Sequence, residues 1–286
     1  MSNHYGKLYV VATPIGNLAD ISFRAIDTLK QVDLIAAEDT RHVKTLLQHY
    51  GINNIVMAFH QHNEEKIADN LLEKLREGLS IALVSDAGTP LLSDPGMPLV
   101  RKVKEAGLQV VPIPGACALI AALSAAGLPV TQFSFEGFLP RTASARKAFF
   151  TENRDSPKTW VFYESSHRIL AALEDMLAVL EADRQIVIAR ELTKLHETIV
   201  KTTLTNAVEL VAHDDNMRKG EFVVIVDGAA KANKEDVAVS HEQMHILTIL
   251  MSKCSTKTAV ELAVEITGAR KKLLYQAALA LENRRE

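Results

Sequence analysis

Short apolar runs alternate with amphipathic stretches over the first 115 residues, and this alternation predicts an α/β domain. Several runs are apolar at every position, which is typical of parallel strands covered by helices on both faces. A helix is predicted over 63–77, where Asn63 is a candidate N-cap, Glu64 and Glu65 suit the first turn, and Gly78 can end it. The predicted strands cover residues 7–12, 32–37, 55–59, 80–84 and 109–113.

The pattern changes after residue 116. Residues 116–130 are apolar but contain Ser124 and Gly127 and are too short to cross a bilayer, so a buried helix is predicted. Further helices are expected near 143–152, 167–180 and 206–212, and strands over 133–138, 159–163, 185–189, 198–203 and 221–227. The connection between 189 and 198 is too short for a crossover helix. Those two strands are therefore predicted to be antiparallel in a mixed sheet.

Small and charged residues over 229–239 predict a linker, and three short helices are expected after it, over 241–251, 256–266 and 269–284. The predicted organisation is thus an N-terminal α/β domain with a parallel sheet (1–116), a second α/β domain with a mixed sheet (117–230), and a linker with a small helical domain (231–286). A chain of 286 residues is long enough for more than one domain.

Composition narrows the class of protein only slightly. The chain is 48% hydrophobic and 23% charged, as in ordinary globular proteins, and its net charge of -3 means that any RNA site must be a local basic patch. Two cysteines, Cys117 and Cys254, have no disulfide or metal-ligand spacing and are expected to be reduced. The polar first residues show no signal peptide, so we expect a cytoplasmic protein without a membrane segment.

Three loops rich in glycine and proline follow predicted strands. They are Thr13-Pro14-Ile15-Gly16-Asn17 after the first strand, Ser85-Asp86-Ala87-Gly88-Thr89-Pro90 with Ser93-Asp94-Pro95-Gly96 after the fourth, and Pro112-Ile113-Pro114-Gly115-Ala116 at the fifth. Ligands of open α/β sheets bind outside the carboxyl ends of the strands, so these loops are expected to converge on one ligand. The spacings of the common phosphate-binding loops are absent. A ligand held by main-chain groups and small side chains is therefore predicted, rather than a nucleoside triphosphate.

Polar clusters at other strand ends allow more than one interpretation. Asp39 or Thr40 suits a helix N-cap. His60 and His62 superficially resemble metal ligands, but no third ligand is evident, so no metal is expected. Buried charges need partners. One interpretation of the charged residues at these strand ends is therefore a structural ion-pair network between the domains, formed by Glu38, Arg41, Arg190, Glu191 and Lys194.

Read in order, the motifs resemble those of a family of ribosomal RNA small-subunit methyltransferases within the tetrapyrrole-methylase superfamily (class III methyltransferases). The segments that carry the resemblance are LYVVATPIGNLADISFRA, AAEDTR, IALVSDAGTPLLSDPG, PIPGA, FEGFLP, VFYESSHR, ARELTKLHETI and KGEFVV. The match runs from Lys7 to about Asp227, and the helical tail is similar to the small domain of the same proteins. Relatives acting on corrinoids or porphyrins carry Gly-Asp-Pro where this chain has Ser85-Asp86-Ala87, a departure from the pattern of the superfamily.

The resemblance implies a two-domain tetrapyrrole-methylase-like fold with a small C-terminal helical domain, a homodimer, and S-adenosylmethionine bound between the α/β domains. It further implies 2′-O-methylation of a cytidine ribose in the decoding region of small-subunit ribosomal RNA. The cofactor contacts it implies in the strand-end loops are Pro14, Gly16, Ser85, Asp86, Ala87, Gly88, Gly115 and Ala116. In the second domain we expect Tyr163, Arg190 and Glu221 to contribute.

A ribose hydroxyl must lose its proton to attack a methyl group, so a general base is expected among Glu38, Asp39, Glu191 and Lys194. A lysine base would need a lowered pKa. Replacing Glu191 or Lys194 is expected to lower turnover more than cofactor binding. Candidate RNA contacts, with solvated surface charges as the alternative, are Arg41, Arg141, Arg146, Lys147, Arg270, Lys271 and Lys272.

Two other functions fit the same fold. A small-molecule methylase acting on a tetrapyrrole-like substrate would have a closed apolar pocket and no need for the basic tail. A ribosomal RNA-binding assembly factor without catalysis would bind RNA and leave no methyl product. The sequence also leaves open whether naked RNA or the assembled small subunit is the substrate.

Overall fold

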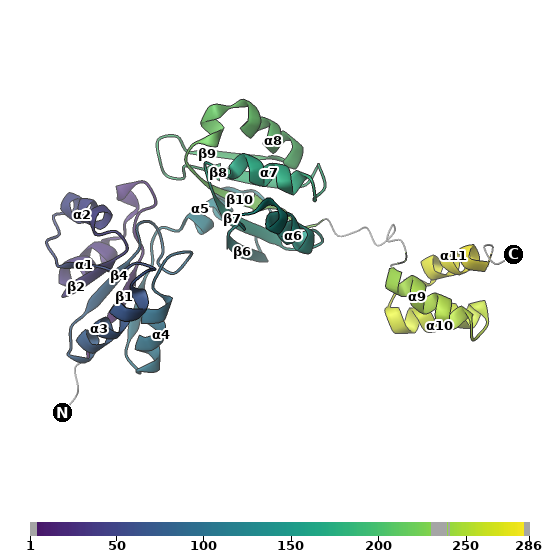
Figure 1. The fold of residues 1–286 in the computed structure, drawn as a ribbon, viewed down its shortest axis with the longest axis horizontal. Helices are drawn as coiled ribbons and strands as arrows, with labels where there is room; N and C mark the ends of the chain where they lie inside the picture. The colour runs from purple at the N-terminus through teal and green to yellow at the C-terminus, as the bar shows by residue number, and fades with distance from the viewer. Residues whose placement is uncertain (1–4, 230–238, 240, 283–286) are drawn as a thin grey trace. The chain divides into compact units, whose positions relative to one another are not determined.

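The computed structural model describes residues 5–229, 239 and 241–282. The chain forms two compact units, Met1–Ala229 and Ala230–Glu286 (Figure 1). The first unit contains two five-stranded sheets, and the second unit is helical. Among the described residues, no helix is long and apolar enough to cross a membrane.

The first sheet is parallel throughout, with the strand order β3-β2-β4-β1-β5. Each predicted strand exists but is one or two residues shorter at one or both ends. The central strands β2 and β4 are buried at every position, as the continuous apolar runs predicted. The strands are β1 (Leu8–Val11), β2 (Leu34–Ala37), β3 (Val56–Ala58), β4 (Ile81–Val84) and β5 (Val110–Ile113).

Helices cover both faces of this sheet. Helices α1 (Phe23–Gln31) and α2 (Thr40–His49) pack on one face, and α3 (Glu64–Arg76) and α4 (Met97–Glu105) on the other. Asn63 is the N-cap residue of α3, as predicted, but its side chain does not cap the helix, because its Oδ1 accepts a hydrogen bond from His60 N (2.8 Å). Gly78 follows the end of α3 with a φ of 97°, as its predicted role requires.

The second sheet is mixed, with the order β6-β7-β10-β8-β9. Only β6 and β7 are parallel, and the prediction that β8 and β9 are antiparallel is confirmed. Strands β7 and β8 extend beyond their predicted ends to Ser165 and Arg190. The strands are β6 (Phe133–Phe138), β7 (Thr159–Ser165), β8 (Gln185–Arg190), β9 (Thr198–Thr203) and β10 (Glu221–Val226).

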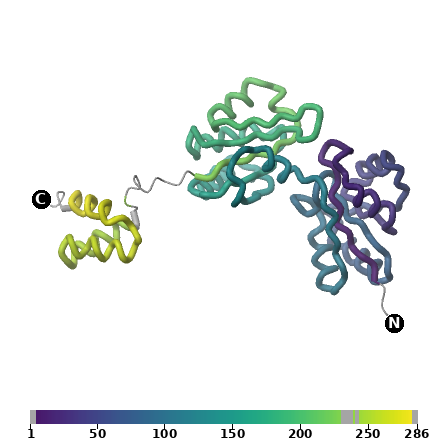
Figure 2. Tube along the Cα trace, turned by 180° about the vertical axis from the view of Figure 1, so that it is seen from behind, coloured from purple at the N-terminus to yellow at the C-terminus, as the bar shows by residue number. Residues whose placement is uncertain are grey.

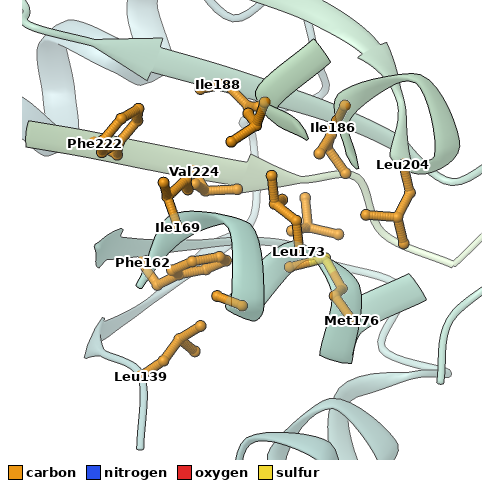
Figure 3. Packing of buried hydrophobic residues seen from close by; sticks show 14 of the residues in the cluster. Leu139, Phe162, Ile169, Leu173, Met176, Ile186, Ile188, Leu204, Phe222 and Val224 are labelled. Carbon is orange, nitrogen blue, oxygen red and sulfur yellow. The ribbon is translucent and has the colours of Figure 1, made fainter. Parts of the chain in front are cut away.

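Both faces of the second sheet are also buried. Helices α6 (Ala143–Asn153), α7 (Ile169–Leu177) and α8 (Leu204–His213) cover the face that carries Phe162, Ile188 and Val224, which pack with Leu173 and Met176 in Figure 3. Helix α5 (Ala118–Ala125), the predicted buried helix, covers the opposite face. Short 3-10 turns occur at Leu18–Asp20 and Asp215–Arg218.

The C-terminal unit has its own small core. The three predicted helices are present as α9 (His241–Met251), α10 (Thr256–Thr267) and α11 (Lys271–Glu282), coloured yellow-green to yellow in Figure 2. Leu247, Val260 and Leu274 are fully buried between them. Gly268 ends α10 in the left-handed conformation (φ 65°). Most of the predicted linker (229–239) and the predicted helical residues 283–284 lie outside the described residues.

Candidate active site

A cavity of about 360 Å³ lies where loops of the first sheet meet strand ends of the second sheet. Its volume falls in the range of small-molecule binding sites. The loops after β1 and β4 and the start of α5 contribute Ile15, Ala87, Gly88, Thr89, Leu92, Ser93, Asp94, Cys117 and Ala118. The second sheet and its flanking loops contribute Phe138, Tyr163, Glu164, Ser165, Ala189, Leu192, Glu221, Phe222 and Val223.

The three predicted loops are joined to one another through their backbones. Thr13 N donates to Gly88 O (2.9 Å) and Gly88 N donates to Thr13 O (3.0 Å), linking the loops after β1 and β4. Thr89 Oγ1 donates to Ala116 O (3.1 Å), linking the loops after β4 and β5. Since β4, β1 and β5 are neighbours in the sheet, the three loops lie together. That they bind one ligand stays a prediction.

The residues predicted to contact a cofactor separate into three groups. Four of them line the main cavity: Ala87, Gly88, Tyr163 and Glu221. Four line a smaller cavity of about 130 Å³ beside α2: Pro14, Gly16, Ser85 and Asp86. Gly115 and Ala116 line neither cavity. A Cβ on Gly115 would lie 2.9 Å from Ala12 Cβ, so this glycine permits close packing of the β1 and β5 ends.

Arg190 is not placed to contact a ligand, which corrects its predicted role. Its side chain is buried, and it does not line the main cavity. Its Nε donates to Lys219 O (2.6 Å) and its Nη1 donates to His196 O (3.0 Å). The guanidinium therefore holds the chain segments on either side of β8.

Backbone strain among the described residues is concentrated in two loops at the cavity. Four non-glycine residues have positive φ angles: Leu91 (74°), Ser93 (69°), Glu191 (50°) and Thr193 (66°). The first two belong to the β4–α4 loop and the others to the β8–β9 loop, and both loops line the cavity. Such conformations persist only where the surroundings enforce them, and they cluster at functional sites.

Three carboxylates line the main cavity, and no lysine, arginine or histidine among the described residues does. Burial raises the pKa of Asp94. Burial also raises the pKa of Glu164, whose Oε1 accepts from Ser165 N (2.8 Å). Its Oε2 lies 3.1 Å from Arg168 Nη2 as an ion pair but has no hydrogen-bond partner. The cavity thus favours a ligand that carries positive charge over a polyanion such as a triphosphate.

The first two predicted bases, Glu38 and Asp39, have opposite electrostatic environments. Burial, together with Asp94 and Asp86 nearby, raises the pKa of Glu38. Asp39 is the N-cap of α2, and its hydrogen bonds from Arg41 lower its pKa to about 2. The N-cap interpretation of Asp39 is confirmed, and its assignment as a base is not supported, since so acidic a group accepts a proton poorly.

The other two predicted bases, Glu191 and Lys194, form an ion pair with each other. Lys194 Nζ lies 2.9 Å from both Glu191 Oε1 and Glu221 Oε2. Burial alone would lower the pKa of Lys194, but these hydrogen bonds outweigh it and raise the pKa. Lys194 is therefore a cation, which contradicts its assignment as a base. The predicted five-residue network is present only in part. Glu191 pairs with Lys194, and the charge of Arg190 helps to lower the pKa of Glu191, but Glu38 and Arg41 have other neighbours.

The predicted RNA contacts differ in accessibility. Arg146 is buried, and its Nε and Nη2 donate to Asp175 Oδ2 (2.9 and 2.6 Å), so its assignment to an RNA surface is wrong. Lys147, half-exposed, lies 3.4 Å from the same carboxylate group. Arg41 is exposed beside Asp39, and Lys271 is exposed beside Glu261. The other three, Arg141, Arg270 and Lys272, are exposed.

His60 and His62 lie in the turn after β3, with ring centroids 6.0 Å apart. No group of three or more histidine, cysteine, aspartate or glutamate side chains in the described part of the chain could hold a metal ion. Cys117 and Cys254 are free thiols.

Sequence reasoning left most lining residues of the main cavity without a role, among them Asp94, Phe138 and Glu164. All three lie in motifs that the sequence analysis singled out, SDPG, FEGFLP and YESSHR. Their positions at strand ends were the available signal. Which strand ends face each other was not readable from the sequence.

Comparisons with known proteins agree with this fold. The profile of the family "Tetrapyrrole (Corrin/Porphyrin) Methylases" matches residues 7–208, and that of "RsmI C-terminal HTH domain" matches residues 237–282. Among solved structures, the methyltransferase CobJ has a TM-score of 0.59 at 21% identity and covers 79% of this chain and 95% of its own. A uroporphyrin-III C-methyl transferase from Thermus thermophilus, solved with S-adenyl homocysteine, has a TM-score of 0.52 at 18% identity, covering 78% and 98%.

These matches define the fold as that of the tetrapyrrole methylases, as predicted. A protein from Escherichia coli O157:H7 named "Ribosomal RNA small subunit methyltransferase I" is 52% identical, covering 97% of this chain and 96% of the relative. One of the same name from Haemophilus influenzae is 51% identical, covering 98% and 99%. The chain belongs to this family of ribosomal RNA small subunit methyltransferase I proteins within the tetrapyrrole methylases.

Proposed function

We propose that this protein is an S-adenosylmethionine-dependent methyltransferase of small-subunit ribosomal RNA. The observation that carries the proposal is the cavity formed by the joined loops after β1, β4 and β5 and by the facing strand ends of the second sheet. The near full-length similarity to relatives of that name supports the choice of substrate.

The residues present fit such a cofactor. S-adenosylmethionine carries a sulfonium and an ammonium group, and the main cavity offers Asp94, Glu164 and Glu221 without a basic side chain among the described residues. Apolar side chains such as Ile15 and Leu192 suit an uncharged adenine ring. Gly88 lines the cavity with a φ of 83°, a backbone conformation that favours glycine. We assign the cofactor to this cavity, with the smaller cavity at Pro14, Gly16, Ser85 and Asp86 beside it.

When bound, S-adenosylmethionine supplies a methyl group that is already activated by the positive sulfur. The protein must hold the acceptor oxygen in line with that group, and positioning of this kind contributes about 7–11 kcal/mol in well-oriented reactions. The strained loops 91–93 and 191–193, kept in place by surrounding packing, are suited to this task.

A carboxylate with a raised pKa is the best placed proton acceptor. Asp94 lines the cavity, and Glu38 lies close enough for its pKa to be raised by Asp94 and Asp86. We assign the general base to one of this pair, with Asp94 first because it faces the cavity. Removing a positioned base typically costs about 10²–10⁴-fold in rate.

We further propose that the acceptor is the 2′-hydroxyl of a cytidine in the decoding region, within the assembled small subunit. The exposed cations Arg41, Arg141, Arg270 and Lys272 are suited to phosphate contacts. We expect the protein to be cytoplasmic. We also expect a homodimer, because a second copy doubles the basic surface that RNA can contact, which matters for a chain whose net charge is -3.

Labelled S-adenosylmethionine, incubated with the protein and with small subunits that lack the modification, tests the proposal. Label mapped to one ribose 2′-oxygen is the expected result, and naked ribosomal RNA is the parallel substrate. Label on a nucleobase would overturn the 2′-O assignment. Labelling of small tetrapyrroles alone, or binding to subunits without transfer, would overturn the proposed substrate or the catalysis.

A further inference from the structure

Phe138 owes its orientation to a β-bulge at the end of β6. Between the paired positions Phe135↔Val161 and Phe138↔Tyr163, strand β6 advances three residues while β7 advances two. The extra residue is accommodated by Gly137 in the left-handed conformation (φ 65°). In regular alternation Phe135 and Phe138 would point to opposite faces of the sheet, but here both rings contact Tyr163, with centroids 4.8 and 5.7 Å away.

Hydrogen bonds hold the residues behind and after Phe138. Tyr163 Oη accepts a hydrogen bond from Leu119 N (3.2 Å) at the start of α5, and burial raises the pKa of this phenol to about 12, so the acceptor stays a neutral hydroxyl. The chain just after Phe138 is held by Arg168, whose Nη2 donates to Leu139 O (2.7 Å) and Pro140 O (2.9 Å). The buried Arg146 holds the next residue through its bond to Arg141 O (2.9 Å).

Despite this support, Phe138 remains 56% exposed, and it lines the main cavity. A Cβ on Gly137 would lie only 3.6 Å from Ser93 Oγ, so the bulge is next to the strained β4 loop that carries Asp94. An aromatic ring aimed by a bulge, backed by a second ring and left open to solvent is a surface on which an unstacked nucleobase can lie.

We propose that Phe138 is the stacking platform for the base of the nucleotide whose ribose is methylated, and thus a residue that positions the substrate. This inference rests on the proposed function. Bases of unstacked nucleotides lie on aromatic side chains in many RNA-binding proteins, and such a ring compensates the lost base stacking. Arg141, three residues further along the same loop and exposed, is suited to a phosphate of the same strand.

The test measures three properties of the full-length Phe138→Ala and Phe138→Tyr variants: single-turnover methyl transfer to small subunits, affinity for S-adenosylmethionine by calorimetry, and oligomeric state by light scattering. Losing one base–aromatic stack corresponds to about a 5- to 150-fold loss. We expect F138A to lose transfer at subsaturating subunits by such a factor and to keep cofactor affinity within about threefold. F138Y, which keeps the ring, should retain most of the activity.

Phe133→Ala is the matched control, because Phe133 is an exposed phenylalanine at the other end of the same edge strand. It should transfer methyl groups at the wild-type rate. A second arm uses reconstituted subunits with an abasic residue at the mapped position. The wild type and F138A should then react equally, because the base that would stack on the Phe138 ring is missing.

Each other result overturns the inference in a recognisable way. If F138A weakens cofactor binding as much as transfer, the ring holds the cofactor. If it changes the oligomeric state, the ring contacts a second copy of the chain. If it transfers normally, the ring has no role in positioning the base. If the wild type itself labels no subunits, the proposed function fails, and this inference fails with it.

Discussion

The parallel sheet β3-β2-β4-β1-β5 and the mixed sheet β6-β7-β10-β8-β9 border the same cavity but offer it different atoms. The parallel sheet contributes chiefly backbone and small side chains, at loops joined by the Thr13–Gly88 hydrogen bonds. The mixed sheet contributes larger side chains, among them Phe138, Tyr163 and Glu164.

The two sheets also stabilise their loops differently. In the parallel sheet, three neighbouring strands end at one edge, and close backbone approach at Gly88 and Gly115 is sufficient. In the mixed sheet, buried arginines hold loop carbonyls and are neutralised by carboxylates, as in the Arg146–Asp175 pair. The difference predicts that changes at the glycines of the first region act on ligand binding and that loss of a buried ion pair in the second region acts first on stability.

The largest effect is expected from Asp175→Ala, which removes the buried partner of Arg146 (2.6 Å). An uncompensated buried charge costs about 3–5 kcal/mol, so the free energy of unfolding in denaturant titrations should fall by that amount. Asp69→Ala is the matched change on α3, a helix that covers the first sheet. Its exposed ion pair with Lys102 should cost less than about 1 kcal/mol. Equal losses in both variants would contradict the comparison.

Asp94→Asn is expected to lower single-turnover transfer by about 10²-fold or more while leaving the fold intact. A base acts deprotonated, and burial raises the pKa of Asp94, so the wild-type rate should start to fall at a higher pH than for an ordinary carboxyl group. Below that pKa the rate should drop about tenfold per pH unit. Glu38→Gln is the parallel variant. If the fall of the rate at low pH is still present in D94N and is absent in E38Q, Glu38 is the base.

Gly88→Ala is expected to weaken cofactor binding about tenfold. The positive φ of 83° costs an alanine about 1–2 kcal/mol, and its Cβ would lie 3.3 Å from Ile15 Cγ2, which lines the cavity. Gly107→Ala is the matched control, because Gly107 has a similar φ (71°) and an added Cβ there would have no atom within 4 Å. It should lose similar stability and keep full affinity in calorimetric titrations. Weakened binding in both variants would refute a local effect at Gly88.

The smallest effect is expected from Lys194→Ala. Lys194 contacts Glu221, a lining residue, but the Glu221 side chain is 80% exposed, so solvent weakens the pair. Cofactor affinity should fall about two- to fivefold, and turnover at saturating cofactor should stay near that of the wild type. The sequence-based expectation for this variant was a larger loss of turnover than of binding. A 100-fold drop in turnover with unchanged cofactor affinity would support the sequence-based expectation and a direct role of Lys194 in methyl transfer.

Much of the architecture was readable from local patterns. All ten predicted strands exist, because short apolar runs of strand length bounded by glycine, proline and polar residues are typical of buried strands. The antiparallel pairing of β8 with β9 followed from the length of their connection alone. The strand-end loops stood out in the sequence because glycine and proline restrict or widen the backbone angles of a turn by themselves.

The charged residues were harder to assign, and the physical reason is long-range pairing. Arg146 resembled a surface cation in sequence, yet it is buried against Asp175, which lies on another helix. Lys194 was a candidate base until Glu191 and Glu221 were seen to hold it as a cation. The charge state of such groups depends on partners that are distant in the chain.

By itself, then, the sequence determined the elements, the type of each sheet, the strand-end loops and, through its motifs, the family. Only the tertiary structure decided which strand ends face one another, that Asp94 and Glu164 line the main cavity, and that a bulge at Gly137 turns Phe138 onto the face of Tyr163. Secondary structure follows from interactions between near neighbours in the chain. The direction of a side chain and its pKa follow from groups that folding brings together.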